Sequence, residues 1–219
     1  MKVTVIIPSL NPAGVDVSKY RFPNVTQIII NSYKGRSRAR NMGARKAKGD
    51  FLLFIDDDTY FSEETYRKYI LDVFLKHPND IVCADHPILS TRVLGISKKL
   101  FFDLGGFDES FETGEDADLG FRALERGVKI RKIPKSVIFH KEHPTISSRR
   151  DELLRCKNKI RYALKYGKAW ISGDNVQKIT PKSFFELMIK SRTKGMANVI
   201  KLVTSILSFY YYFFKELIR

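Results

Sequence analysis

The stretch that decides the fold is Ala47-Lys-Gly-Asp-Phe-Leu-Leu-Phe-Ile-Asp-Asp-Asp58. Residues Phe51–Ile55 are apolar throughout, which is typical of a strand that is buried on both faces of a sheet. Three aspartates follow at the carboxyl end of this strand, where α/β sheets bind their ligands. Adjacent carboxylates repel one another, and a divalent ion such as Mg²⁺ or Mn²⁺ relieves that repulsion, although short acidic runs also occur in solvated turns. The position after a buried strand favours a metal site at Asp56, Asp57 and Asp58.

Strands and helices alternate around this stretch. We expect strands at Val3–Ile7, Gln27–Ile30 and Asp80–Ala84, and helices at Gly35–Lys48 and Ser62–Lys76. Such alternation predicts an α/β fold, a three-layer α/β/α sandwich around a mostly parallel central sheet.

The pattern after residue 85 is mixed. The elements expected there are Val93–Ser97, Val128–Ile133 and Val137–Phe139 as strands, and Lys98–Leu104 and Glu115–Arg126 as helices. From Arg149 onward the sequence is basic and helical in character. We therefore expect an α/β domain over residues 1–148 and a basic helical region over residues 149–219.

The charge is unevenly distributed along the chain. In total, 39 Lys+Arg face 24 Asp+Glu, a net charge of +15, which favours an anionic partner such as nucleic acid, a membrane surface or a phosphorylated small molecule. Residues 1–50 carry +8, residues 51–127 carry −8, and residues 128–219 carry +15. Two cysteines, Cys83 and Cys156, are too few for a disulfide framework, which favours a reducing compartment. The first residues form too short an apolar run for a signal peptide, so we expect a cytoplasmic protein.

A second group of carboxylates surrounds Gly114 at the start of an expected helix. Its members are Glu112, Glu115, Asp116 and Asp118. They could merely complement the helix dipole and cap the first turn. A glycine-pinned loop, Gly105-Gly106-Phe107-Asp108, precedes them, and a carboxylate with an acidic neighbour could act as a general base toward a hydroxyl.

The segment from Gly35 to Arg45 carries four arginines before the acidic strand end. It could be a basic helix face or a nucleic-acid patch. It could equally cradle a diphosphate, since arginine is the bidentate partner of phosphate.

Several motifs together resemble glycosyltransferase family 2. They are Val3-Thr-Val-Ile-Ile-Pro-Ser-Leu-Asn11, Ala39-Arg-Asn-Met-Gly43, Ala47 to Asp58, Gly105-Gly-Phe-Asp108 and Gly114-Glu-Asp116. The resemblance covers most of residues 1–140 and implies a GT-A (Rossmann-like) fold, a nucleotide-diphospho-sugar donor, a divalent metal (Mn²⁺ or Mg²⁺) and inversion at the anomeric carbon. The Gln-x-x-Arg-Trp sequence of processive members is absent, so transfer of a single sugar is expected.

The resemblance also assigns roles within the acidic motifs. Asp56-Asp57-Asp58 matches the DXD-type motif, in which Asp58 would hold the metal and Asp56 or Asp57 would face the nucleotide ribose. Asp116 matches the usual catalytic base, and Glu115 would orient the acceptor.

Further positions concern the nucleotide. Pro8 and Ser9 would line the nucleoside pocket, and Arg40 could help to neutralise the diphosphate. After the second strand, the family has an acidic residue that reads the base, whereas this chain has Asn31-Ser32-Tyr33. We place Asn31 in the nucleotide site, with the completeness of the base pocket left open.

A histidine is the last expected site residue. His140 matches a position that completes the metal site in some members, with His143 as the neighbouring competitor. A hydrogen-bonded histidine at a strand end is an equally good interpretation of His140.

The C-terminal region combines basic and aromatic residues. Leu202 to Phe214 is thirteen residues without a charge and is rich in tyrosine toward its end, with lysines and arginines on both sides. A spanning helix needs about 20 apolar residues, so an interfacial anchor on anionic lipid fits better than a span. The alternatives are a helix packed on its own domain or on a second subunit.

These observations predict a metal-dependent, inverting hexosyltransferase at the inner face of the cell membrane, with a saccharide or lipid-linked acceptor. The rival classes are a basic nucleic-acid-binding protein or metal-dependent nuclease, and a catalytically silent relative that acts as a membrane adaptor. A nucleic-acid partner is not expected, because it explains the net charge but not the ordered motifs.

Overall fold

The computed structural model describes residues 1–32, 35–111, 113–141, 158, 161–162, 165–166, 168–170 and 176–178, the last two ranges as backbone. The chain divides into two units, Met1–His143 and Pro144–Arg219. In the second unit, β9 (Lys168–Trp170) and β10 (Val176–Lys178) pair as antiparallel strands. The domain boundary expected after residue 148 stays a prediction, and the apolar run Leu202–Phe214 lies outside the described residues.

No helix in the described part of the chain has both the length and the apolar composition to cross a bilayer.

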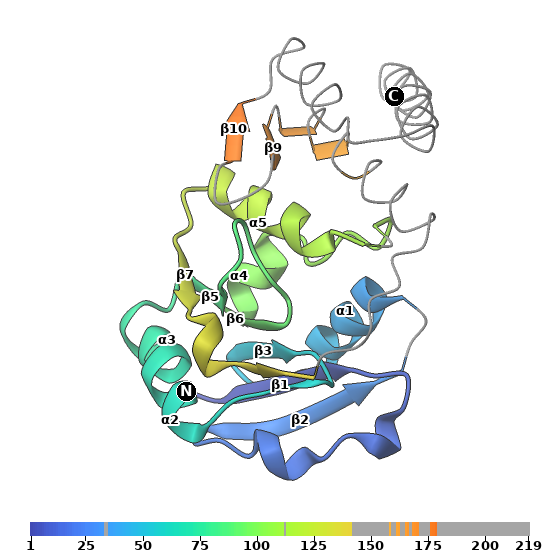
Figure 1. The fold of residues 1–219 in the computed structure, drawn as a ribbon, viewed down its shortest axis with the longest axis vertical. Helices are drawn as coiled ribbons and strands as arrows, with labels where there is room; N and C mark the ends of the chain where they lie inside the picture. The colour runs from blue at the N-terminus through green and yellow to red at the C-terminus, as the bar shows by residue number, and fades with distance from the viewer. Residues whose placement is uncertain are drawn as a thin grey trace, which may run out of the picture. The chain divides into compact units, whose positions relative to one another are not determined.

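Six strands of the first unit form one sheet (Figure 1). They are β1 (Val3–Pro8), β2 (Val25–Asn31), β3 (Phe51–Ile55), β5 (Ile81–Ala84), β6 (Val93–Ser97) and β7 (Ile130–Ile133), in the order β2-β1-β3-β6-β5-β7. β1 runs parallel to β2 and β3, and β5 runs parallel to β7, whereas β6 is antiparallel to both of its neighbours. Residues 85–92 are too few for a crossover helix, so the chain must return from β5 into β6 in the opposite direction. The predicted mostly parallel sheet is confirmed, with β6 as the antiparallel member.

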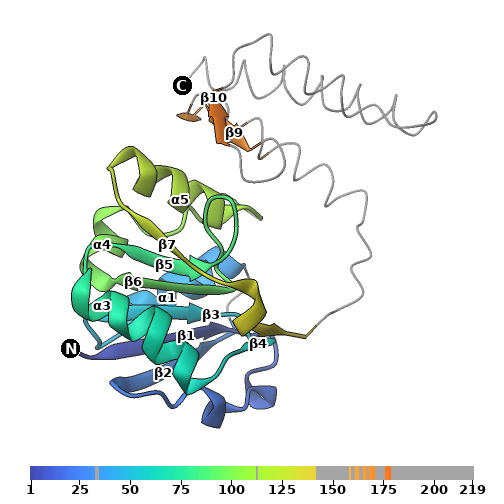
Figure 2. The same ribbon diagram turned by 60° about the vertical axis from the view of Figure 1, so that its left-hand side comes forward.

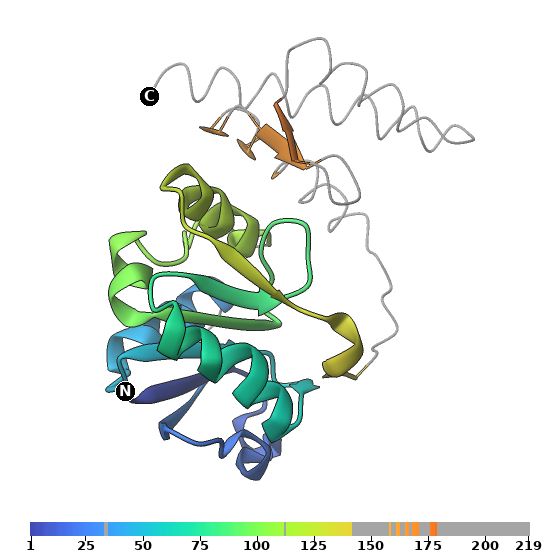
Figure 3. The ribbon, with the colours of Figure 1, turned by 90° about the vertical axis from the view of Figure 1, so that its left-hand side faces the viewer.

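Helices cover both faces of this sheet, as Figures 2 and 3 show. α1 (Arg36–Lys46) and α4 (Lys98–Asp103) lie on one face. On the other face, α2 (Glu63–Thr65), a π-helical stretch (Tyr66–Leu71) and α3 (Asp72–Lys76) form one continuous helical segment. α5 spans Glu115–Glu125. The predicted three-layer arrangement is therefore confirmed.

Apolar side chains pack on both faces of the sheet, which explains why Phe51–Ile55 is apolar at every position. Leu53 belongs to the cluster on the α2–α3 side, which includes Tyr66 and Phe74. Phe54 points to the opposite layer, where its ring centroid lies 5.2 Å from that of Phe101. All five strand residues are buried, and a fully buried large apolar side chain contributes about 1.5–3 kcal/mol.

Some expected elements differ in the structure. The strand predicted at Val137–Phe139 is instead a 3₁₀ turn (Lys135–Val137) followed by β8 (Phe139–His140). Pro134 begins this turn, because its ring fixes φ at a turn value and its carbonyl accepts the Val137 N–H at 3.2 Å. β8 pairs with β4 (Thr59–Tyr60) in a separate two-stranded ribbon.

The connection between β1 and β2 is short. It contains two 3₁₀ turns, Pro12–Gly14 and Val17–Tyr20, where a longer connection would have room for an α-helix.

Candidate active site

The carboxyl ends of β1 and β3 bring the first predicted site residues to the same edge of the sheet. The strands are parallel neighbours, with Ile6 opposite Phe54. Pro8 ends β1, and the Asp56-Asp57-Asp58 run begins directly after β3. The two segments therefore leave the sheet side by side, in the place where α/β sheets bind ligands.

Ser9 and Asn31 are both buried at this edge. The Ser9 N–H donates to the Asn31 carbonyl at 2.9 Å, and the Ser9 hydroxyl accepts the Asn11 N–H at 3.1 Å. The Asn31 side-chain amide donates to the Ala39 carbonyl at 3.0 Å, so it fastens β2 to α1. The contacts of Pro8, Ser9 and Asn31 with a nucleoside stay predictions.

Arg40 is a nearly fully buried charged side chain of the site, with 1% of its surface exposed. One terminal nitrogen lies 2.6 Å from a Glu115 oxygen, and the other lies 2.7 Å from an Asp56 oxygen. The other three arginines of the segment, Arg36, Arg38 and Arg45, are exposed. Arg40 thus joins the two acidic motifs, which lie on different elements. Its predicted contact with a diphosphate stays a prediction.

Asp116 follows Glu115 in the first turn of α5 and is partly buried. Burial, reinforced by the neighbouring Glu115 charge, raises the pKa of Asp116 to about 7. The Ala117 N–H, which donates to the Asp116 carboxylate at 2.8 Å, opposes this shift, as does Arg40. A carboxylate with a pKa near neutrality has the proton affinity that suits a general base.

Asp58 and His140 meet across the ribbon of β4 and β8. Thr59 lies opposite His140, and the Lys141 N–H donates to the Asp58 carbonyl at 2.9 Å. This pairing brings His140 Nε2 to 3.2 Å from Asp58 Oδ2, with 28% and 22% of the two side chains exposed. Asp57 is exposed between its two neighbours, and His143 lies outside the described residues.

The Asp58–His140 pair supplies one carboxylate oxygen and one imidazole nitrogen. These donors fit Mn²⁺, which accepts both, better than Mg²⁺, which takes oxygen ligands. Among the described residues, no group of three His, Cys, Asp or Glu side chains is arranged to hold a metal ion.

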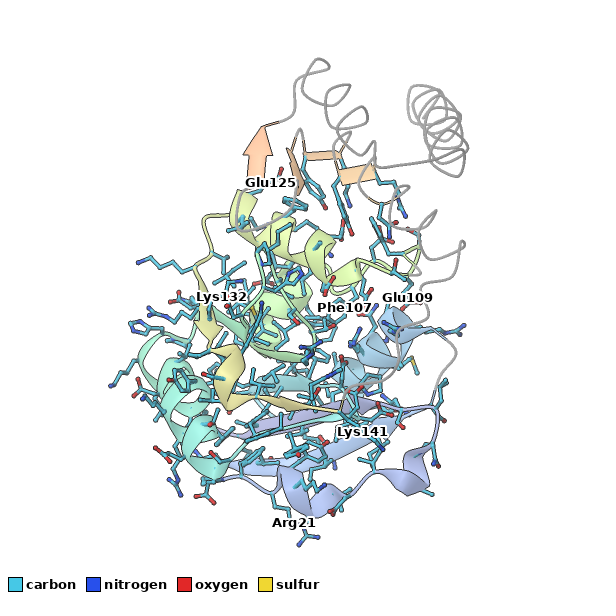
Figure 4. All side chains as sticks on the ribbon, in the orientation of Figure 1. Arg21, Phe107, Glu109, Glu125, Lys132 and Lys141 are labelled. Atoms are coloured by element: carbon cyan, nitrogen blue, oxygen red, sulfur yellow. The ribbon has the colours of Figure 1, made fainter. Side chains whose placement is uncertain are left out.

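Sequence analysis missed two residues that hold the glycine-pinned loop. The Asn41 side chain donates to the Phe107 carbonyl at 2.8 Å and accepts the Phe107 N–H at 2.9 Å. Arg122 binds Asp118 at 2.6 Å and also donates to the Gly106 carbonyl at 2.8 Å. Figure 4 shows Phe107 and Glu109 beside α1, and the Glu109 carboxylate also accepts a hydrogen bond from Asn41.

A sequence signal for Asn41 exists. Ser37, Asn41 and Ala44 follow the i, i+4, i+7 spacing of one helix face, and all three are buried. A buried asparagine needs hydrogen-bond partners, and the loop backbone provides them.

Glycine is required at two positions of this region. Gly106 has φ of 68°, and a Cβ there would lie 3.0 Å from the Asn41 side-chain oxygen. Gly114 has φ of 81° at the residue that precedes α5. Both φ values lie in the left-handed region that other residues rarely adopt. The loop and the start of α5 therefore depend on these glycines.

Comparison with known proteins decides the family. The family model described as Glycosyl transferase family 2 matches residues 16–127, just over half of the chain. The chain belongs to this family. The matched region of this glycosyl transferase family 2 chain contains Arg40, the three aspartates, Glu115 and Asp116.

Relatives of this family 2 chain include an uncharacterized glycosyltransferase of Haemophilus influenzae, 27% identical over 59% of this chain and 55% of that protein. The pre-mycofactocin glycosyltransferase of Mycobacterium tuberculosis is 27% identical over 51% of this chain and 31% of that protein. The chain therefore spans about half or less of the length of these relatives.

Solved structures share the fold. The mannosyltransferase PcManGT of Pyrobaculum calidifontis, in complex with GDP-Man and Mn²⁺, has a TM-score of 0.54 at 16% identity and covers 94% of this chain and 73% of its own. Glucosyl-3-phosphoglycerate synthase of M. tuberculosis, in complex with Mn²⁺ and UDP-glucose, has a TM-score of 0.57 at 12% identity and covers 76% of this chain and 79% of its own. The predicted GT-A fold of the family 2 chain is confirmed.

Proposed function

We propose that this chain transfers a single sugar from a nucleotide-diphospho-sugar to an acceptor hydroxyl, with inversion at the anomeric carbon. The observation that carries the proposal is the convergence of two acidic motifs at one edge of the sheet. Arg40 binds Asp56 of the first motif and Glu115 of the second at 2.7 and 2.6 Å. Family membership supports sugar transfer as the chemistry of this site.

Asp116 is the proposed general base. Its raised pKa allows it to accept the proton of the acceptor hydroxyl as that oxygen forms the new bond to the anomeric carbon. The bond from the anomeric carbon to the nucleoside diphosphate breaks on the opposite side, so the configuration inverts. General-base assistance of this kind contributes roughly 10²–10⁴ in rate.

Asp58 and His140 are the proposed metal ligands. These two side chains would hold a divalent ion, which would neutralise the charge that develops on the departing nucleoside diphosphate. The imidazole nitrogen at 3.2 Å from the Asp58 carboxylate favours Mn²⁺ over Mg²⁺. The Mn²⁺ in the mannosyltransferase and synthase structures supports this choice. Asp56 or Asp57 is proposed to contact the donor ribose.

The acceptor is proposed to be a saccharide or a lipid-linked sugar at the inner face of the cell membrane. The support is the +15 charge of residues 128–219, which suits an anionic surface. The described residues include few of that region, so the membrane contact rests on sequence alone.

A thermal-shift screen with UDP, GDP and dTDP, each with and without Mn²⁺, tests the fold, the metal and the donor class together. We expect one nucleotide to raise Tm only when Mn²⁺ is present. The matching sugar nucleotide is then used to measure transfer by Asp116→Asn and Asp58→Ala.

Asp116→Asn is expected to keep Mn²⁺-dependent nucleotide binding and to lose transfer by about 10²-fold or more. Asp58→Ala is expected to lose both. Undiminished transfer by Asp116→Asn refutes the base assignment, and the absence of any Mn²⁺-dependent shift refutes the proposed donor chemistry.

A further inference from the structure

The Arg40 guanidinium is nearly enclosed by protein groups. Its two terminal nitrogens are engaged by Glu115 and Asp56, and its central carbon lies 5.7 Å from the centroid of the Phe107 ring. Arg40 Nε has no hydrogen-bond partner among the described residues and is buried. A side chain that is only 1% exposed has little surface left for a diphosphate.

Glu115 is enclosed in the same way. Its side chain is 5% exposed, and its carboxylate is bound to Arg40 at 2.6 Å. Asp116, the next residue, is more exposed. The two carboxylates of the Gly-Glu-Asp motif therefore have different surroundings, because Glu115 is buried against Arg40 of α1 and Asp116 is only partly buried.

We propose that Arg40 is a positioning residue that ties the end of β3 to the start of α5, and that Glu115 acts through this ion pair and not by contact with the acceptor. This inference rests on the proposed function of Asp116 as the base. It replaces the sequence-based roles of Arg40 at the diphosphate and of Glu115 at the acceptor.

The burial of the Arg40–Glu115 ion pair strengthens the connection between the end of β3 and the start of α5. Removing a charge from water is costly unless a partner with good geometry compensates it, and both distances here are those of strong charge-assisted hydrogen bonds. Arginine suits the role because its planar fork presents two separate N–H groups to two carboxylates. A lysine offers a single point charge and binds both carboxylates less well.

The electrostatic environment of Asp116 follows from this arrangement. The groups that act on its charge are Glu115 and the Ala117 N–H on α5, Arg40 on α1 and Asp56 after β3. The Asp116 charge in turn contributes to the raised pKa of the Cys83 thiol on β5. Glu115 disfavours the ionised form of Asp116, and Arg40 favours it. Removing the Glu115 charge should therefore lower the pKa of Asp116, and removing the Arg40 charge should raise it.

The first experiment is a ¹³C NMR titration of the aspartate carboxyl carbons of the full chain, without donor or metal. The Asp116 signal is identified by its loss in Asp116→Asn. We expect Glu115→Gln to lower the Asp116 midpoint by about one pH unit. The double variant Arg40→Met/Glu115→Gln should raise it again by about one pH unit relative to Glu115→Gln. The double variant avoids leaving Glu115 buried without its cation.

Arg40→Lys/Glu115→Gln is the matched control, because it keeps the charge and should titrate close to Glu115→Gln. Near-ultraviolet circular dichroism confirms that each variant is folded. Equal midpoints for Glu115→Gln and Arg40→Met/Glu115→Gln overturn the coupling of Arg40 to Asp116.

The second experiment measures transfer kinetics with the sugar nucleotide found in the screen. If Glu115 acts through Arg40, Glu115→Gln lowers kcat by about 10–100-fold and leaves the acceptor KM within about twofold. A raised acceptor KM with unchanged kcat places Glu115 at the acceptor and overturns the inference. Because the NMR titration needs no turnover, an inactive wild-type chain with the expected midpoints refutes the proposed function while the coupling stands.

Discussion

Two ionic groups occupy the same edge of the sheet and differ in their access to solvent. Arg40 and Glu115 have side chains that are 2% and 5% exposed, whereas Asp58 and His140 are 22% and 28% exposed. In the first group, the positive charge of Arg40 and the negative charge of Glu115 neutralise each other inside the protein. The second pairs a carboxylate with an imidazole where a ligand from solvent can reach both. The difference separates side chains that are paired inside the protein from side chains that solvent reaches.

The two groups also differ in the structural elements that carry their side chains. Arg40 reaches Asp56 and Glu115 from the middle of α1, a regular helix that packs on the sheet. His140 is carried by a two-residue strand in a separate ribbon. The buried group of Arg40 and Glu115 is fixed by the packing of large elements. The partly exposed pair of Asp58 and His140 depends on a few backbone hydrogen bonds.

The largest effect is expected from breaking the buried group. Arg40→Met leaves Asp56 and Glu115 without their cation and should lower the free energy of unfolding by about 3–5 kcal/mol in urea denaturation. Arg67→Met is the matched control, since Arg67 pairs with Glu63 on an exposed helix face, and it should cost less than about 1 kcal/mol. Similar losses for the two variants contradict the distinction between the groups.

Substitutions of Asp58 and His140 should lower stability less than Arg40→Met does. They should weaken Mn²⁺ binding strongly. Asp58→Asn and His140→Gln should each weaken Mn²⁺ binding by about tenfold or more, measured by calorimetry with the nucleotide present. Their Tm values without metal should stay within about 2–4 °C of the wild type. If His140→Gln binds Mn²⁺ as tightly as the wild type does, His140 is not a ligand.

The third effect is a change in the pH dependence of stability and concerns Asp116, which is partly buried. Because its folded-state pKa of about 7 exceeds its ordinary value of 3.8, the folded protein binds this proton more tightly than the unfolded chain. Stability should therefore fall as pH rises from about 4 to about 7.

Asp116→Asn removes this dependence and should raise Tm above pH 7 by about 2–4 °C or more, with the difference shrinking toward pH 4. A pH-independent difference between Asp116→Asn and the wild type contradicts the raised pKa.

Much of the fold could be predicted, because the inner strands β3 and β5 are buried at every position and are continuous apolar runs in the sequence. Phe51–Ile55 is the clearest case, and the structure has it with the predicted bounds. The β4–β8 ribbon could not be predicted, since Thr59–Tyr60 is two residues long and carries no periodic signal. The antiparallel direction of β6 could have been inferred from the short connection that precedes it.

The site was predictable in composition and less so in its contacts. The motifs indicated Arg40, Asp56 and Glu115, and the structure brings these three together. That Arg40 faces inward could not be read from a segment with four arginines, because the helical phase of α1 against the sheet decides which of them is buried. Asn41 was missed because its partners are backbone groups of a loop more than sixty residues away.

The ribbon of β4 and β8 has a consequence for biosynthesis. Asp58 belongs to the first part of the chain to leave the ribosome, and it gains its imidazole neighbour only when His140, at the end of the described α/β unit, has emerged and paired. A nascent chain that stops before β8 contains all six strands of the central sheet but lacks the proposed metal pair. Mn²⁺-dependent protection from proteolysis should therefore appear only after His140 has left the ribosome, which makes the proposed metal pair a reporter of the completed α/β unit.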